Sequence, residues 1–185
     1  MSKKLKVAGI AGSLGSKAIS KKFLKEVKKS FGEDVELTEI LYADIPVYNA
    51  DIEYPTPASV KRVRDELKEY DAIVIAMPEY NLSIPGSLKN LLDWLSRPEQ
   101  PGQPKPVLDY PILVFSFSAG ISGGMVPQEL LRSLLSYLGA SVMPQPRASF
   151  TGAYNLLDKD GNLVLDDTSK EFLDQSAKAF VAFAQ

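Results

Sequence analysis

The sequence predicts an α/β protein with a mainly parallel sheet and helices on both faces. Short apolar runs alternate five times with amphipathic segments of helical period along the 185 residues, and this alternation favours parallel strands joined by helices. Several of the apolar runs end in polar loops, which is where open α/β sheets bind ligands. No repeat, low-complexity tract or linker divides the chain, so residues 1–185 are expected to form a single domain.

The composition excludes several function classes. A net charge of −2 and a pI near 5.3 argue against a nucleic-acid-binding protein. The chain has neither cysteine nor histidine, which removes disulfides, thiolate chemistry and Ser-His-Asp triads, and we expect no metal site. An enzyme with such a composition is expected to use a cofactor. No apolar stretch reaches the roughly 20 residues of a membrane span, and Ser13 interrupts the N-terminal run too early for a signal peptide. We therefore expect a cytoplasmic protein.

The first half of the chain supplies three of the expected strands. The short, largely apolar run Leu5–Ala11 predicts a buried strand. A helix is expected from Ala18, with Ile19, Phe23 and Val27 on one face, and Gly32 ends it. In order, the next elements are an edge strand over 35–41, a long irregular segment over 42–57, a helix over 58–70 and a buried strand over 72–77.

The second half begins with a helix over 85–96, whose leucine stripe should face the core. Trp94 falls off that stripe, so it either anchors a partner subunit or packs under the loops of its own domain. The remaining elements are a proline-rich connection over 97–106, a strand over 111–116, a helix over 127–138, a short fifth strand over 140–143, a turn over 158–162 and a closing helix over 168–184.

The loop between the first strand and the first helix is a candidate phosphate site. A phosphate there would meet free backbone N–H groups and the positive end of the helix dipole. Gly12 and Gly15 permit close approach, and Ser13, Ser16 and Ser20 offer hydroxyl donors. The spacing matches neither the Rossmann fingerprint nor a Walker loop. The alternative is an ordinary strand-to-helix turn.

The loop after the strand over 72–77 is a candidate platform for a flat redox cofactor, with flavin as our first hypothesis. Pro78 and Pro85 stiffen its two ends. Tyr80 can stack on a ring, and Asn81 offers both a donor and an acceptor. Glu79 only accepts hydrogen bonds when ionised, so we expect its side chain to brace the loop. The alternative is a rigid turn without a ligand.

Several motifs together resemble the NADPH-dependent FMN reductases. They are Gly12-Ser13-Leu14 after an apolar strand, Ile45-Pro46-Val47-Tyr48-Asn49, the run PEYNLSIPGSLKNLLDWLSRP, and Ser118 with Gly123-Gly124. This family includes bacterial quinone, chromate and azo-dye reductases. The resemblance implies a flavodoxin-like three-layer α/β/α sandwich with a five-stranded parallel sheet.

The resemblance also implies positions for FMN. The residues that would hold its phosphate are Ser13, Leu14, Gly15, Ser16, Lys17, Ala18, Ile19 and Ser20. Those that would line the isoalloxazine are Pro78, Glu79, Tyr80 and Asn81, and those at the other edge of the ring are Ser118, Ala119 and Gly120. The family assembles as dimers or tetramers with flavin sites near subunit interfaces. This assembly favours the partner-facing interpretation of Trp94.

The activity implied is transfer of hydride from NADPH or NADH to N5 of FMN, and on to quinones or other acceptors such as chromate, azo compounds or free flavin. One alternative is a flavodoxin-like electron carrier. Another is a scaffold with weakened FMN binding, because Gly15, Ala18 and Ser20 stand where the family usually has Arg, Ser and Asn. Lys17 or Lys22 could partly replace the arginine. The sequence leaves the physiological acceptor, the choice of NADH or NADPH and the choice of dimer or tetramer open.

Overall fold

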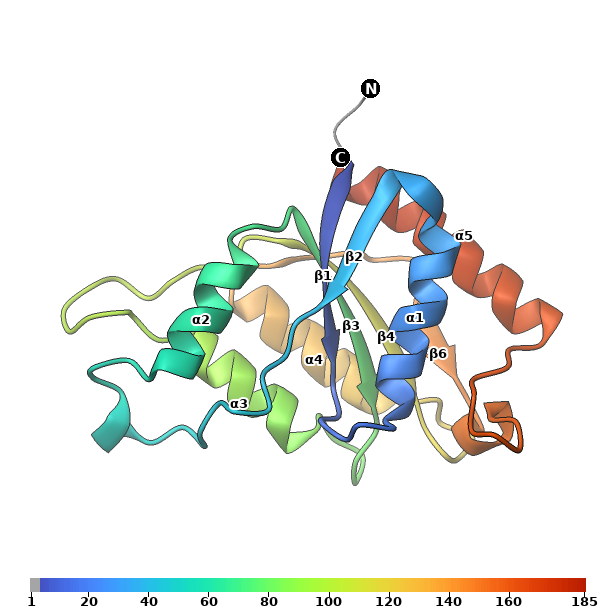
Figure 1. The fold of residues 1–185 in the computed structure, drawn as a ribbon, viewed down its shortest axis with the longest axis horizontal. Coiled ribbons are helices and arrows are strands. Elements are labelled where there is room, and N and C mark those ends of the chain that lie inside the picture. Colours follow the sequence, from blue (N-terminus) through green and yellow to red (C-terminus); the bar gives the residue numbers. More distant parts are fainter. Residues whose placement is uncertain (1–3) are drawn as a thin grey trace.

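A parallel sheet in the order β2-β1-β3-β4-β5 forms the centre of the computed structural model, which describes residues 4–185 (Figure 1). The strands are β1 (Leu5–Ala11), β2 (Val35–Glu39), β3 (Ala72–Pro78), β4 (Pro111–Phe117), β5 (Ser141–Val142) and β6 (Ala148–Phe150). The helices are α1 (Ile19–Phe31), α2 (Ala58–Leu67), α3 (Gly86–Leu95), α4 (Met125–Tyr137) and α5 (Asp167–Ala184). Among the described residues, no helix combines the length and apolarity needed to cross a bilayer.

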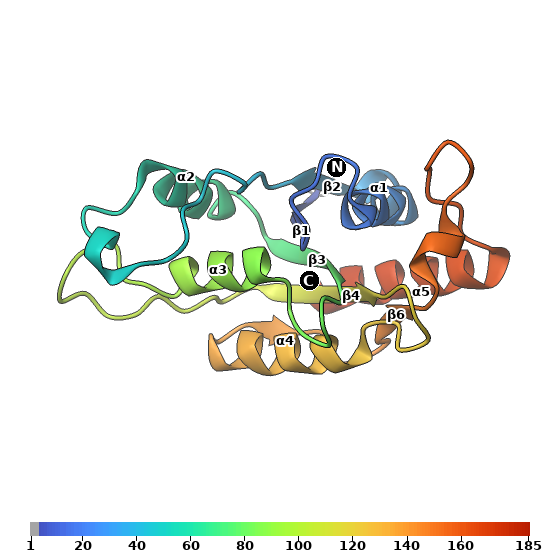
Figure 2. The same cartoon turned by 90° about the horizontal axis from the view of Figure 1, so that it is seen from below.

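Helices cover both faces of the sheet, so the expected three layers are confirmed. Alternate residues of β3 point to opposite sides: Val74 and Ala76 pack with α1 and α5, whereas Ile75 and Met77 pack with α2, α3 and α4. Figure 2, which looks toward the carboxyl ends of the strands, shows the two groups of helices on opposite sides of the sheet. The leucine stripe of α3 faces the core as predicted.

The fifth position of the sheet is occupied by two short strands. β5 pairs with Pro111 and Ile112 at the start of β4, and β6 pairs with Phe115–Phe117 at its end. The prediction of a single short strand there was therefore incomplete, and the sheet has six strands within the described residues. Pro144 and Pro146 lie between the two segments and cannot donate ladder hydrogen bonds, which explains the interruption.

Trp94 packs under a loop of its own domain, so the partner-facing interpretation of this side chain was wrong. Its exposed fraction is 0%. The indole Nε1 donates to the carbonyl oxygen of Pro46 at 2.8 Å, and the ring of Tyr48 meets the indole edge-on at 5.0 Å between centroids. The long segment over 42–57 is therefore fixed on α3 through Pro46 and Tyr48.

We expect Trp94→Phe to lower the free energy of unfolding by about 1–2 kcal/mol, since the indole packing and its hydrogen bond are both lost. The loss is limited because Asn90 Nδ2 also donates to the Pro46 carbonyl, at 2.9 Å. Urea unfolding measures the change. Tyr137→Phe, at an exposed position of α4, is the control and should have little effect. Equal midpoints for Trp94→Phe and wild type would contradict this role of the indole.

Candidate functional site

The carboxyl ends of β1 and β3 meet at Gly12. Its N–H donates to the carbonyl of Ala76 at 2.8 Å. A Cβ atom added at Gly12 would lie 2.9 Å from Cδ of Pro78 and 3.1 Å from Cα of Met77. Only glycine therefore fits without movement of the neighbouring strand, and this close approach brings the predicted phosphate loop beside the predicted ring platform.

The amino end of α1 presents hydrogen-bond donors of the kind that bind anions in proteins. No side chain of residues 4–185 caps the helix, and the first N–H groups of a helix have no acceptor within it. Ser20, in the first turn, is fully buried, and its Oγ has no hydrogen-bond partner among the described residues. Buried hydroxyls are normally paired. An unpaired hydroxyl beside free helix N–H groups fits the phosphate of FMN.

A hollow of about 420 Å³ joins the two predicted regions. Its lining residues are Ser13, Gly15, Ser16, Lys17, Ala18, Ile19, Ser20, Pro78, Tyr80, Phe117 and Tyr154. All the predicted phosphate residues except Leu14 line it, together with Pro78 and Tyr80 from the ring platform. Lys17 is its one charged lining residue within the described chain. Lys22, the other candidate replacement for the arginine, instead donates to the carbonyl of Gly161.

The ring platform ends in a tight hairpin. Tyr80 and Ser83 exchange backbone hydrogen bonds of 3.2 and 3.0 Å, and the two residues between them, Asn81 and Leu82, have φ angles of 52° and 57°. Positive φ at both central positions is typical of a type I′ turn and is unusual for leucine. The hydroxyl of Tyr80 also donates to Ser13 Oγ at 3.0 Å, so this side chain spans the gap between the platform and the phosphate loop.

Glu79 joins the platform to the loop after β4. Its Oε2 accepts a hydrogen bond of 2.8 Å from Ser122 Oγ, which lies 2.9 Å from Ser118 Oγ. The backbone N–H of Glu79 donates to the Phe117 carbonyl at 2.9 Å. The Glu79 side chain therefore braces the two loops against each other, as expected from its acceptor-only chemistry.

The remaining predicted site residues do not line the hollow. Ser118 is buried, and its hydroxyl donates to the Gly120 carbonyl at 3.1 Å. Four others are exposed to solvent and do not line the hollow: Leu14, Asn81, Ala119 and Gly120. Their parts in flavin binding stay predictions.

Phe117 and Tyr154 line the hollow although the sequence did not identify them. Tyr154 is positioned by hydrogen bonds that tie its short helical turn to the loop after β4: Gly152 N donates to the Gly120 carbonyl at 3.0 Å, and Ala153 N to the Ser118 carbonyl at 2.8 Å. No local pattern reports such contacts. Phe117 ends β4 next to the bracing serines, and its place at the end of a strand was the available signal.

Tyr42 holds the end of β1 as a neutral group. Its hydroxyl donates to the Ala11 carbonyl at 2.6 Å. Burial raises the pKa of Tyr42 well above its usual value, with a smaller opposing effect from a hydrogen bond with Ser87. Its hydroxyl therefore stays protonated and holds the end of β1.

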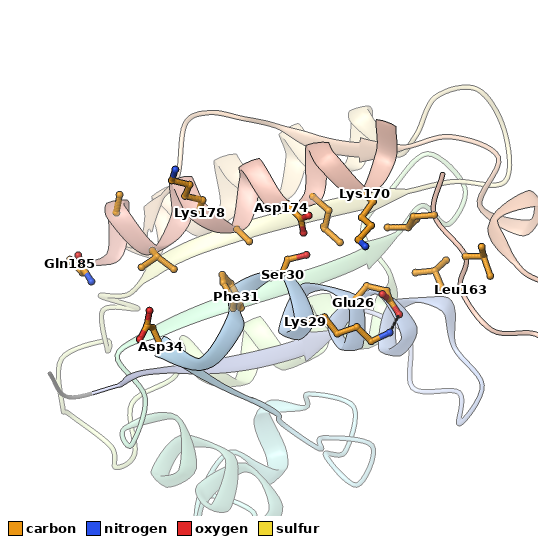
Figure 3. A pocket seen from close by; sticks show the side chains of 16 residues that line it. Glu26, Lys29, Ser30, Phe31, Asp34, Leu163, Lys170, Asp174, Lys178 and Gln185 are labelled. Atoms are coloured by element: carbon orange, nitrogen blue, oxygen red, sulfur yellow. Dashed lines mark hydrogen bonds and ion pairs between the residues drawn. The ribbon is translucent and has the colours of Figure 1, made fainter. Parts of the chain in front are cut away.

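A larger hollow, of about 970 Å³, lies between α1 and α5 and contains none of the predicted site residues (Figure 3). Charged side chains of both signs surround it, and Glu26 and Lys29 pair across 2.7 Å. In residues 4–185 we find no group of three His, Cys, Asp or Glu side chains placed to hold a metal ion.

Comparison with known proteins identifies the family. The model of the NADPH-dependent FMN reductase family matches residues 5–155. A quinone reductase of Escherichia coli K12 is 35% identical over 189 residues, covering 100% of this chain and 98% of the relative. An NAD(P)H-dependent FMN reductase of Pseudomonas aeruginosa is 37% identical over 183 residues, covering 97% and 95%.

Solved structures agree with this result. The flavoenzyme NAD(P)H:(acceptor) oxidoreductase FerB of Paracoccus denitrificans superposes with a TM-score of 0.84 and 31% identity, covering 97% of both chains. A flavodoxin from the domain Archaea, at 13% identity and a TM-score of 0.56, supports the flavodoxin-like fold alone. The chain belongs to the NADPH-dependent FMN reductase family, and it is an oxidoreductase that uses FMN with NAD(P)H as its electron donor.

Proposed function

We propose that this protein reduces quinones at FMN, with NADPH or NADH as the donor, and that residues 1–185 form one FMN-binding domain. The relatives named as quinone reductases support this substrate class, as does a Burkholderia relative named 2-hydroxy-1,4-benzoquinone reductase at 29% identity. The overall balance is the conversion of NAD(P)H, a proton and a quinone into NAD(P)⁺ and a hydroquinone.

The unpaired Ser20 hydroxyl at the amino end of α1 is the observation that carries the placement of the cofactor. In this proposal the phosphate lies against residues 13–20, the isoalloxazine lies on Pro78–Asn81, and Ser118–Gly120 border its far edge. One hollow joins residues of the phosphate loop with Pro78 and Tyr80 of the ring platform. This connection supports an FMN orientation that runs from the phosphate loop to the ring platform. When bound, FMN supplies the two-electron redox chemistry by which the donor reduces the acceptor.

The protein's own part is to bind and orient. No aspartate, glutamate or histidine lines the hollow within the described residues, so no carboxylate or imidazole there acts as an acid or base. The Tyr80 hairpin, braced through Glu79, presents a stiff surface to the ring. Positioning of this kind accelerates a reaction by removing the entropy of alignment.

The test is oxidation of NADPH, followed at 340 nm, by protein loaded with FMN and supplied with benzoquinone. We expect rapid turnover that depends on the quinone. Stopped-flow mixing with NADPH alone should bleach the flavin absorbance quickly, whereas a flavodoxin-like electron carrier would leave it unchanged. Protein that binds no FMN and does not accelerate NADPH oxidation would support the scaffold alternative and contradict the proposal.

Chromate, azo compounds and free flavin are proposed as additional acceptors, because the resemblance to the family implies them as well as quinones. An azoreductase of Bacillus anthracis shares the fold at 16% identity and a TM-score of 0.54. NADPH oxidation in the same assay, with each of these compounds in place of benzoquinone, tests whether it is an acceptor. The cytoplasmic location stays a prediction from the sequence.

We also propose a homodimer or homotetramer whose contact includes the apolar surface beside the site. Four exposed apolar side chains of the two site loops and the start of α4 are proposed to belong to it: Leu82, Ile121, Met125 and Val126, with exposed fractions from 50% to 97%. Exposed apolar groups that adjoin one another commonly mark protein interfaces.

We expect Val126→Asp to shift the protein to a smaller assembly, because a buried unpaired carboxylate is costly. Light scattering after size-exclusion chromatography measures the mass. Val164→Asp, at an exposed valine beside the α1–α5 hollow, is the control and should leave the mass unchanged. A wild-type mass equal to one chain would contradict the oligomer.

A further inference from the structure

A separate hollow of about 330 Å³ adjoins the proline-rich segment 97–106. Leu67 at the end of α2, Leu95 at the end of α3 and Tyr110 just before β4 contribute to its walls. All three lie toward the amino ends of the strands, whereas the FMN site lies at the carboxyl ends. Prolines, Val107 and Leu108 make most of the remaining wall apolar.

Arg64 borders this hollow with an incompletely paired guanidinium. Its exposed fraction is 7%. Nη2 donates to the carbonyls of Trp94 at 2.6 Å and Arg97 at 2.8 Å, which ties α2 to the end of α3. Nε and Nη1 are buried and find no acceptor among residues 4–185. Leaving a buried donor unpaired costs about 1–3 kcal/mol, and more when it is charged.

Arg97 borders the same hollow in a similar state. Its Nε is buried and has no acceptor in the described part of the chain, while its guanidinium carbon lies 4.6 Å from the centre of the Tyr48 ring. Two arginines with unsatisfied N–H donors among the described residues therefore line one small, mostly apolar space. Guanidinium N–H groups match the two oxygens of a carboxylate in geometry as well as charge.

The other charged groups of the wall leave it positive. Lys68 lines the hollow and pairs with Asp65 at 3.0 Å and with Glu99 at 3.4 Å. Among the described residues, Glu99 is the one carboxylate of the lining. Arg64, Arg97 and Lys68 carry three positive charges, and Glu99 together with Asp65, the partner of Lys68, leaves an excess of one. An anion is thus favoured, and the apolar walls favour one whose charge is confined to one end.

We propose that this hollow binds a small carboxylic acid with a compact apolar body, its carboxylate paired with Arg64 and Arg97. A free phosphate fits less well because it has no apolar surface to bury against the apolar walls. A volume of about 330 Å³ lies within the range of small-ligand sites. The site is independent of the FMN site and does not rest on the quinone-reductase activity.

Isothermal titration of the FMN-loaded protein with benzoate tests the proposal, with hexanoate as an aliphatic acid and benzyl alcohol as the uncharged control. We expect saturable binding of at least one acid at constant ionic strength and no binding of the alcohol. Arg97→Met should weaken binding about tenfold or more, since it removes a charged donor but keeps an apolar stem. Glu99→Gln should tighten it roughly threefold by removing a like charge.

Arg62→Met is the matched control. Arg62 lies on α2, as Arg64 does, but it pairs with Asp44 and Glu66 and does not line the hollow. It should leave the affinity unchanged. Circular dichroism checks that each variant is folded. If Arg97→Met does not fold, the affinity of Glu99→Gln for the acid tests the proposal in its place. Absence of acid binding up to about 10 mM, equal binding of the alcohol or of inorganic phosphate, or the same affinity for Arg97→Met and wild type would each overturn the proposal.

Discussion

Replacement of Gly12 by alanine is expected to lower the free energy of unfolding by about 3 kcal/mol and to weaken FMN binding strongly. Forced overpacking typically costs about 1–3 kcal/mol, and the upper end applies because the new methyl group would meet a proline ring and backbone atoms. It would lie 2.9 Å from Pro78 Cδ, 3.1 Å from Met77 Cα and 3.2 Å from the Ala76 carbonyl oxygen. These atoms belong to β3 and to the start of the ring platform, so their displacement should disturb the FMN site as well.

Urea unfolding measures the stability, and quenching of FMN fluorescence measures the affinity. Gly86→Ala is the matched control: Gly86 begins α3, and a Cβ atom there meets nothing within 4 Å. Alanine should be neutral or slightly stabilising at that position, because it reduces the entropy of the unfolded chain. Equal destabilisation by the two substitutions would show that the contact between β1 and β3 is not the cause.

Ser20→Ala is expected to weaken FMN binding by roughly 10- to 100-fold without destabilising the protein free of FMN. A hydrogen bond to a charged group contributes about 1.5–3 kcal/mol. In the chain alone the Ser20 hydroxyl is buried and has no partner among the described residues, so its removal costs no hydrogen bond. The free energy of unfolding should therefore stay the same or rise.

Fluorescence titration with FMN and with riboflavin, which lacks the phosphate, separates this effect from a general disturbance. Ser20→Ala should weaken FMN binding much more than riboflavin binding. Ser30→Ala, on the same helix but away from the FMN hollow, is the control and should change neither affinity. Equal losses for FMN and riboflavin would mean that Ser20 does not contact the phosphate.

Much of the fold follows from the pattern of residues along the chain. The buried strand β3 is apolar throughout, and β1 and β4 each contain one polar residue, Lys6 and Ser116. All three are bounded by polar loops, so composition and length identify them. β6 has three residues and exists through its pairing with Phe115–Phe117, a long-range contact without a local signal. The burial of Trp94 has the same origin, since its partner, the Pro46 carbonyl, lies 48 positions away.

The site was predictable where one loop supplies it and not where the fold assembles it. Residues 13–20 follow β1 directly, and the structure brings most of them together with Pro78 and Tyr80 in one hollow. Tyr154 reaches that hollow only because Gly152 and Ala153 bond to the loop after β4. Gly15, Ala18 and Ser20 differ from the Arg, Ser and Asn usual in the family, which favoured the hypothesis of a weakened phosphate site. The buried unpaired hydroxyl of Ser20 supports a functional phosphate site instead.

The central claim is that FMN binds with its phosphate at the amino end of α1 and its ring on Pro78–Asn81. A crystal structure of the FMN complex tests it most directly. We predict that a phosphate oxygen lies within hydrogen-bond distance of Ser20 Oγ and that the isoalloxazine contacts Tyr80. A flavin bound elsewhere, or one whose phosphate points away from residues 13–20, would contradict the claim.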